Sequence, residues 1–252
     1  MRAVLHGHIN GSAAVAVVGT WDPLMPMHEE LFRHLSEYSR RISLASLAIM
    51  LHPPPPSFIP ESPAEWPIYD DPRTRISLIK ACGIDATLLV HFQKQDLDAP
   101  LTDFLEIIRA HAKLDELWLG ANQTLGRGPD ASNEVLMELS RRRNILLQRL
   151  PPIGQPYLIT EARDLLRQGS LAKLVGLVGR PAVWRRPSRG KFRLPWPPGF
   201  YLCFPTDGPS ASPRGSPITV QFVAEEDGIS STDWPSKDIK WLAFTAGPAD
   251  CP

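Results

Sequence analysis

The stretch AVAVVGTWDPLMPMHEELFRHL, residues 14–35, decides the fold of this 252-residue chain. An apolar run ends at Gly19, a turn follows through residues 20–23, and a helical pattern begins near His28. The first N–H groups of a helix lack intrahelical partners and carry a partial positive charge, so a strand that turns into a helix can hold a phosphate. The stretch therefore predicts an α/β fold with a candidate phosphate site at its first turn.

The same alternation of strand and helix continues along the chain. Apolar runs predict strands at 13–18, 42–51, 86–92, 116–119 and 145–149. Amphipathic or capped segments predict helices that start near residue 28 and span 73–82, 101–112 and 131–143. This order predicts a Rossmann-like doubly wound parallel sheet, whose ligands collect at the carboxyl ends of the strands. The turns after Gly19 and Gly120 are therefore the two candidate ligand turns.

The character of the sequence changes after residue 180. Two short helices, expected at 160–168 and 171–178, precede a segment rich in proline, glycine and arginine. Strand-like runs at 200–204, 218–224 and 239–244 then predict a small β-rich domain. We expect one domain over 1–180 and a second over 181–252. A basic cluster at the boundary could contact phosphate or form a solvated face, and we favour the solvated face; its members are Arg180, Arg185, Arg186, Arg189, Lys191 and Arg193.

Composition limits the class of protein. Lysine plus arginine and aspartate plus glutamate number 27 each, so the formal net charge is zero and no nucleic-acid or membrane-surface partner is expected. The three cysteines are widely spaced and fit neither a disulfide framework nor a zinc site. His6 and His8 alternate as on one strand face, but no further ligand joins them, so we expect no metal site. Without a signal pattern or a membrane-length apolar run, a cytoplasmic protein is expected.

Taken together, these segments resemble the prokaryotic bifunctional riboflavin kinase/FAD synthetase family over about residues 13–180. The family's first motif, G-x-F-D-G-V-H-x-G-H, is similar to G-T-W-D-P-L-M-P-M-H at residues 19–28. Three residues of this motif are kept: Gly19, Asp22 and His28. Trp21 substitutes for the phenylalanine. Met25 occupies the position of the first histidine, and Met27 that of a glycine.

Two further motifs carry the resemblance. The family's G-x-[ND]-F-x-F-G run resembles residues 120–126, in which Gln123 and Leu125 replace the two aromatic residues. The family's S-S-T-x-I-R motif looks like residues 158–163, with Leu158 and Ile159 at the serine positions. The residues kept in these two motifs are Asn122, Thr124, Gly126, Thr160 and Arg163.

The resemblance implies adenylyl transfer from ATP to FMN, which gives FAD and pyrophosphate and uses Mg²⁺. In such a reaction the protein supplies position and positive potential rather than a nucleophile. The implied catalytic residues are His28 and Arg163. The implied nucleotide-binding residues are Gly19, Thr20, Trp21, Asp22 and Thr160. The implied flavin-binding residues are Asn122, Thr124 and Gly126.

Three hypotheses stay open from the sequence. The chain is an FAD synthetase-like enzyme, with activity reduced or lost through Met25 and the replaced serines. Alternatively, it is a flavin-binding, nucleotide-binding or scaffold pseudoenzyme on the same fold, or a nucleotidyltransferase with another phosphorylated acceptor. Residues 197–201, P-P-G-F-Y, resemble the family's kinase module, but its G-F-P-T-A-N signature is absent, so riboflavin phosphorylation is not expected. Small-molecule nucleotides are the expected partners, and the oligomeric state stays open.

Overall fold

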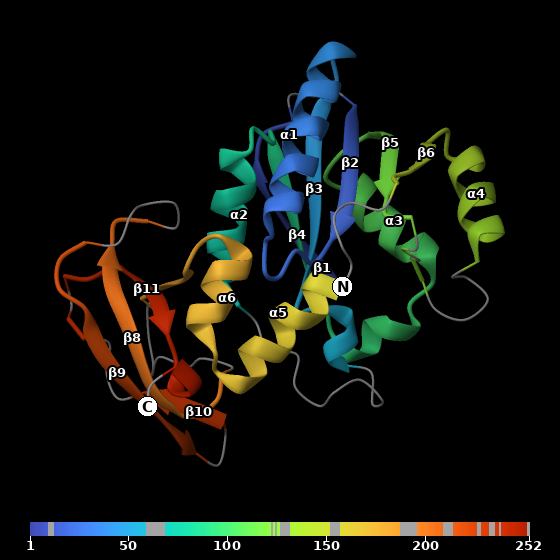
Figure 1. The fold of residues 1–252 in the computed structure, drawn as a ribbon. Helices are drawn as coiled ribbons and strands as arrows, with labels where there is room; N and C mark the ends of the chain where they lie inside the picture. Colours follow the sequence, from blue (N-terminus) through green and yellow to red (C-terminus); the bar gives the residue numbers. More distant parts are fainter. Residues whose placement is uncertain are drawn as a thin grey trace. The chain divides into compact units, whose positions relative to one another are not determined.

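The computed structural model describes most of the chain and divides it into two compact units (Figure 1). The described residues are 1–9, 13–58, 69–121, 123, 125–126, 132–151, 157–186, 196–208, 214–225, 228–231, 235–236 and 238–250. The first unit comprises Met1–Trp21, Met27–Trp66 and Ile79–Gln155. The second comprises Asp22–Pro26, Pro67–Leu78 and Pro156–Pro252. The domain boundary expected at residue 180 stays a prediction.

The first unit is built on a six-stranded sheet in the order β1-β4-β3-β2-β5-β6. Its strands are β1 (Arg2–Gly7), β2 (Ala14–Gly19), β3 (Ala45–His52), β4 (Ala86–His91), β5 (Leu114–Leu119) and β6 (Leu146–Arg149). Strands β2 to β6 are parallel, and β1 joins β4 in the antiparallel direction. If the parallel strands β2 to β6 are renumbered 1 to 5, their order in the sheet is 3-2-1-4-5, the order of a doubly wound sheet. The strand order reverses between β2 and β5. The predicted Rossmann-like parallel sheet is confirmed.

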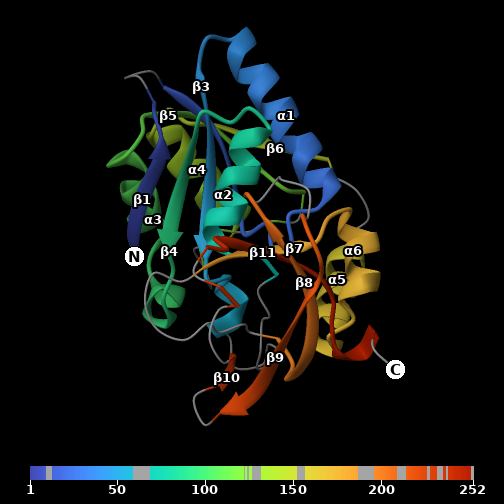
Figure 2. The same ribbon diagram turned by 90° about the vertical axis from the view of Figure 1, so that its left-hand side faces the viewer.

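Helices cover both faces of this sheet. Figure 2 shows α1 (Pro26–Arg41) on one face and α3 (Leu101–Arg109) and α4 (Asn133–Arg142) on the other. Residues 14–18 of β2 are all almost fully buried, which explains their uninterrupted apolar sequence. Their even-numbered side chains join a core that includes Phe104 and Ile108 of α3.

The structure corrects the edges of several expected elements, and the helix expected over 160–168 begins at Tyr157. The strand expected from Ile42 begins at Ala45, because α1 continues to Arg41 and Ser43 turns the chain with a φ of 57°. Ile42 itself is 41% exposed. The helix expected over 101–112 ends at Arg109. Strand β1 was not expected, since an edge strand with alternating exposure has no continuous apolar run.

The second unit contains an antiparallel sheet in the order β10-β9-β8-β11-β7. Its strands are β7 (Ala182–Arg185), β8 (Gly199–Thr206), β9 (Ile218–Glu225), β10 (Gly228–Ser231) and β11 (Trp241–Ala246). Its helices are α2 (Pro72–Ala81), which continues into the first unit, α5 (Tyr157–Gln168) and α6 (Leu171–Val178). Four aromatic side chains pack in its core with ring centroids 5.1–6.4 Å apart; they are Trp196, Tyr201, Phe222 and Phe244. The predicted small β-rich part is thus present, with β7 and β10 added to the three expected strands.

Within the described ranges, none of the helices is both long enough and apolar enough to cross a membrane.

Candidate functional site

The first candidate ligand turn is shaped by Trp21, whose side chain folds back over Gly19. A Cβ atom at Gly19 would lie 2.5 Å from Nε1 of Trp21, so only glycine fits beneath the indole. The indole packs edge-on against Phe32 of α1, with ring centroids 4.9 Å apart. Trp21 is buried and has a φ of 45°, a left-handed value that is rare for a bulky residue. An aromatic side chain of the turn itself therefore holds this backbone in place.

The second candidate ligand turn follows β5 and is tied to β2 by Gln123. The side-chain amide of Gln123 donates from Nε2 to the carbonyl oxygen of Val18 at 3.1 Å. Its Oε1 accepts from the backbone N–H of Gly120, also at 3.1 Å. Arg149, at the end of β6, donates from Nη1 to the carbonyl oxygen of Gly120 at 3.0 Å and to that of Gln123. Gln123 thus bridges the two strand ends between which the sheet reverses its order, the position where doubly wound folds bind ligands.

The residues that the resemblance assigns to flavin binding follow this turn. Gly126 has a φ of 89°, which favours glycine. Leu125, which replaces an aromatic residue of the family motif, is buried in the core of the first unit. Asn122 and Thr124 lie outside the described residues. The assignment of flavin-binding residues therefore stays a prediction.

The start of α1 carries the remaining residues of the first motif. The helix begins at Pro26, where a missing N–H costs no hydrogen bond, and His28 lies half-buried in its first turn. Thr20 is also half-buried. Met25 is 1% exposed. Because a thioether has no hydrogen to donate, the first histidine position contributes packing here and no donor.

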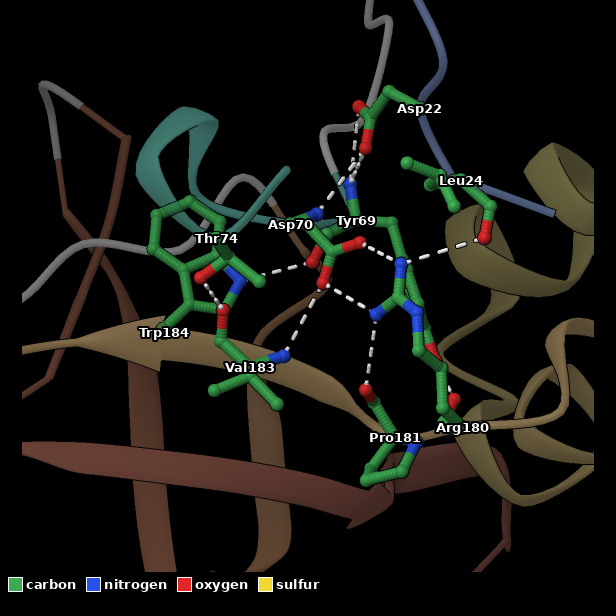
Figure 3. Close-up of polar contacts among 9 residues, drawn as sticks. All are labelled: Asp22, Leu24, Tyr69, Asp70, Thr74, Arg180, Pro181, Val183 and Trp184. Carbon is green, nitrogen blue, oxygen red and sulfur yellow. Dashed lines mark hydrogen bonds and ion pairs between the residues drawn. The ribbon is translucent and has the colours of Figure 1, made fainter. Parts of the chain in front are cut away.

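Asp22 is a buried carboxylate that the second unit holds with backbone amides (Figure 3). The N–H of Tyr69 donates to Oδ1 at 3.1 Å and Oδ2 at 3.2 Å, and the N–H of Asp70 donates to Oδ1 at 3.2 Å. Burial raises the pKa of Asp22 from 3.8 to about 6, and the charge of Arg75 opposes that rise. The carboxylate therefore anchors the turn and titrates close to neutral pH.

Thr160 and Arg163 lie three residues apart on α5, so they share one side of the helix. Thr160 is exposed, and Arg163 is half-buried. Burial lowers the pKa of Arg163 to about 10, and the negative charge of Asp22 acts in the opposite direction. Arg163 is therefore cationic at neutral pH.

A buried ion pair next to Asp22 was not predicted from the sequence. The carboxylate of Asp70 is fully buried and accepts from both terminal nitrogens of Arg180, with Nη1 3.0 Å from Oδ1. Arg180 was expected on a solvated basic face, but its side chain is only 14% exposed. Arg185 and Arg186 are exposed, and the other members of the expected basic cluster lie outside the described residues. Adjacent acidic residues at 70–71 before an expected helix were the one available signal for Asp70.

Potential metal ligands do not gather in the described part of the chain. His6 is half-buried in β1 and His8 is exposed beyond it. Among the residues that the structure describes, no group of three or more His, Cys, Asp or Glu side chains is arranged to hold a metal ion.

Comparison with known proteins adds a family and a fold. Residues 8–156 match the family model of FAD synthetase. A search of curated proteins finds no match. A solved structure of a macrolide-efflux protein from Streptococcus pneumoniae is similar over 97% of this chain and 89% of that chain, with 17% identity and a TM-score of 0.64. An arginine decarboxylase from Paramecium bursaria Chlorella virus aligns over 94% of this chain and 60% of that chain, with 12% identity and a TM-score of 0.16, too low to support an inference.

The similarity to the Streptococcus pneumoniae structure supports the fold alone, because the identity is low. The family match covers β2 with the turn that follows it, α1, and the turn after β5, which are the elements that form both candidate ligand turns. Since the match spans more than half of the sequence, the chain belongs to the FAD synthetase family.

Proposed function

We propose that this protein transfers an adenylyl group from ATP to FMN and releases FAD and pyrophosphate. The observation that carries the proposal is the family match over a doubly wound unit whose first motif keeps Gly19, Asp22 and His28. The resemblance adds a second motif, at residues 158–163, whose Arg163 is half-buried on α5 and cationic at neutral pH. His28, in the first turn of α1, adds a further donor.

The proposed reaction needs no protein nucleophile. A phosphate oxygen of FMN attacks the α-phosphorus of ATP, a new P–O bond forms, and the bond to the β-phosphate oxygen breaks. The bonding electron pair leaves with pyrophosphate, so negative charge grows on the leaving group. The N–H groups at the start of α1 would offset that charge, and the family resemblance assigns the same role to His28 and Arg163. Mg²⁺ would arrive bound to the phosphates of ATP, since Mg²⁺ is commonly held largely by phosphate and water.

Met25 makes a slow enzyme the expected outcome. Loss of one donor that stabilises transition-state charge typically costs about 3–4 kcal/mol, or a factor of roughly 10²–10³ in rate. Met25 is fully buried and cannot donate, and the serine positions before Thr160 are held by Leu158 and Ile159. An assay for FAD formation must therefore detect a rate about a thousandfold lower than that of an ordinary enzyme of this kind.

A second candidate is adenylyl transfer to a phosphorylated acceptor without an isoalloxazine ring. It is favoured by Gln123, which replaces an aromatic residue and whose amide is hydrogen-bonded to both strand ends at the switch point. A polar, fixed side chain at this position offers no face on which a flavin could stack. Under this candidate ATP binds and FMN does not.

The test is incubation of the full-length protein with ATP, FMN and MgCl₂, followed by chromatographic measurement of FAD against a control without protein. We expect slow FAD formation that falls about a hundredfold in His28→Ala, from the loss of one donor. His34→Ala is the matched control, because His34 is exposed on the same helix. Absence of FAD above the control refutes transfer to FMN.

Calorimetric titrations with ATP and with FMN then separate the remaining possibilities. Binding of ATP without FMN binding favours the second candidate. Binding of ATP and FMN without turnover indicates a pseudoenzyme that keeps its ligands. A protein that binds neither ligand contradicts both proposed functions.

A further inference from the structure

The turn at residues 22–26 connects β2 to α1 and is held at two points by buried groups (Figure 3). At its first residue, the carboxylate of Asp22 accepts from the backbone N–H groups of Tyr69 and Asp70. At its middle, the carbonyl oxygen of Leu24 accepts from Nη2 of Arg180 at 3.4 Å. The same two residues, Asp70 and Arg180, make a contact at each point and also form an ion pair with each other. Asp70 donates its N–H to Asp22, and its carboxylate accepts from Arg180.

The ion pair between Asp70 and Arg180 has a fixed geometry. Both terminal nitrogens of the guanidinium donate to the two carboxylate oxygens, and a planar two-point contact sets direction as well as distance. The N–H of Val183 donates to Oδ1 of Asp70 at 3.3 Å, and Nη1 of Arg180 also donates to the carbonyl oxygen of Pro181 at 3.3 Å. A lysine at position 180 would keep the charge but could not form the two-point contact.

The segment that carries Arg180 is joined to the segment that carries Asp70 by further hydrogen bonds. The hydroxyl of Tyr69 donates to the carbonyl oxygen of Arg180 at 2.8 Å. Nε1 of Trp184 donates to the carbonyl oxygen of Tyr69 at 2.9 Å, and Oγ1 of Thr74 donates to that of Val183 at 2.9 Å. Movement of Arg180 would therefore be transmitted to Tyr69 and Asp70, whose N–H groups hold Asp22.

We propose that Asp70 and Arg180 are positioning residues for ATP binding, because their ion pair sets the position of the turn at residues 22–26. This inference rests on the proposed function, since it takes that turn as part of the ATP site. Arg180 lies beyond residue 156, where the family match ends. The affinity of this protein for ATP thus depends on a residue outside the region by which its family is recognised.

The test compares Arg180→Lys with the unaltered full-length protein. Arg214→Lys is the matched control, because Arg214 forms an exposed ion pair with Asp207 in the same unit. Calorimetry measures the Kd for ATP and for FMN, and hydrogen exchange measures the protection of residues 20–26. We expect Arg180→Lys to raise the Kd for ATP about tenfold, to leave the Kd for FMN unchanged and to speed exchange in residues 20–26. Arg214→Lys should change none of these quantities.

The other outcomes distinguish failure of the positioning role from failure of ATP binding itself. If the unaltered protein binds ATP and Arg180→Lys binds it equally well, the pair does not position the site and the inference is wrong. An equal loss of ATP and FMN affinity indicates a general structural role and also overturns it. If the unaltered protein binds no ATP, the proposed function fails. Hydrogen exchange tests separately whether the ion pair of Asp70 and Arg180 holds the turn. If residues 20–26 are equally protected in Arg180→Lys and in the unaltered protein, the ion pair does not hold the turn.

Discussion

Asp22→Asn should make the protein more stable at neutral pH than the unaltered chain. In the folded protein, burial raises the pKa of Asp22 from its ordinary value of 3.8 to about 6, and the charge of Asp70 adds to that rise. The folded state therefore holds the proton more tightly than the unfolded state. Stabilisation from protonated Asp22 is fully present below pH 3.8 and is lost as the pH rises through 6. Asparagine mimics the protonated form and removes this dependence.

The magnitude follows from the pKa difference. One pKa unit corresponds to about 1.4 kcal/mol, so ionised Asp22 costs the folded protein roughly 3 kcal/mol at pH 7.5. At pH 4 the cost is small, because the group is largely protonated in the folded state. The asparagine keeps one oxygen to accept from the N–H groups of Tyr69 and Asp70. We therefore expect the gap between variant and unaltered protein to widen by about 2–3 kcal/mol from pH 4 to pH 7.5.

The assay is urea unfolding of both proteins at pH 4, 5, 6 and 7.5, with the free energy of unfolding extrapolated to zero denaturant. Asp238→Asn is the control, because Asp238 is an exposed carboxylate in the same unit. Titrating groups remote from Asp22 contribute equally to both proteins and cancel in the difference. Parallel stability curves for Asp22→Asn and the unaltered protein would refute the reasoning, because they would show that Asp22 titrates alike in both states.

Three further predictions concern the candidate ligand turns. Gly19→Ala places a Cβ atom 2.5 Å from the indole of Trp21, so thermal unfolding should show a loss of about 1–3 kcal/mol in stability and a shifted tryptophan emission. Gln123→Leu removes the partner of the Gly120 N–H and should lower the free energy of unfolding in urea by about 1–3 kcal/mol; no change would mean that the bridge is not formed. Met25→His inserts a polar ring at a fully buried position, and differential scanning calorimetry should show a lower Tm, from a loss of about 1–3 kcal/mol.

The parallel sheet was predictable because its central strands β2 and β3 are buried on both faces. Such a strand needs apolar residues at every position, and residues 14–18 of β2 show this pattern without any tertiary information. Strands β1, β7 and β10 lacked that signal, since each is an edge strand of four to six residues. Strands β1 and β7 also depend on pairing with the distant strands β4 and β11, which a local window of sequence does not contain.

The sequence predicted which motif residues belong to the candidate site, but not the hydrogen bonds and ion pairs that these and neighbouring residues form. Asp22 and Arg163 were predicted as site residues because the family resemblance marks them, and their roles stay predictions. The amide of Gln123 was expected only as a missing aromatic residue, whereas the structure gives it hydrogen bonds to β2 and to the turn after β5. The pair of Asp70 and Arg180 is separated by 110 residues, so neither periodicity nor spacing could indicate it.

Retention of a motif and retention of its chemistry are separate properties in this chain. Asp22 matches the family motif, yet its carboxylate is satisfied by the amides of Tyr69 and Asp70 and serves to hold the turn. Met25 departs from the motif, yet it is fully buried. Selection for a folded turn would preserve both features whether or not ATP is bound. Tests of the proposed function therefore start with His28 and Arg163, which the family resemblance marks as catalytic and which lie half-buried on α1 and α5.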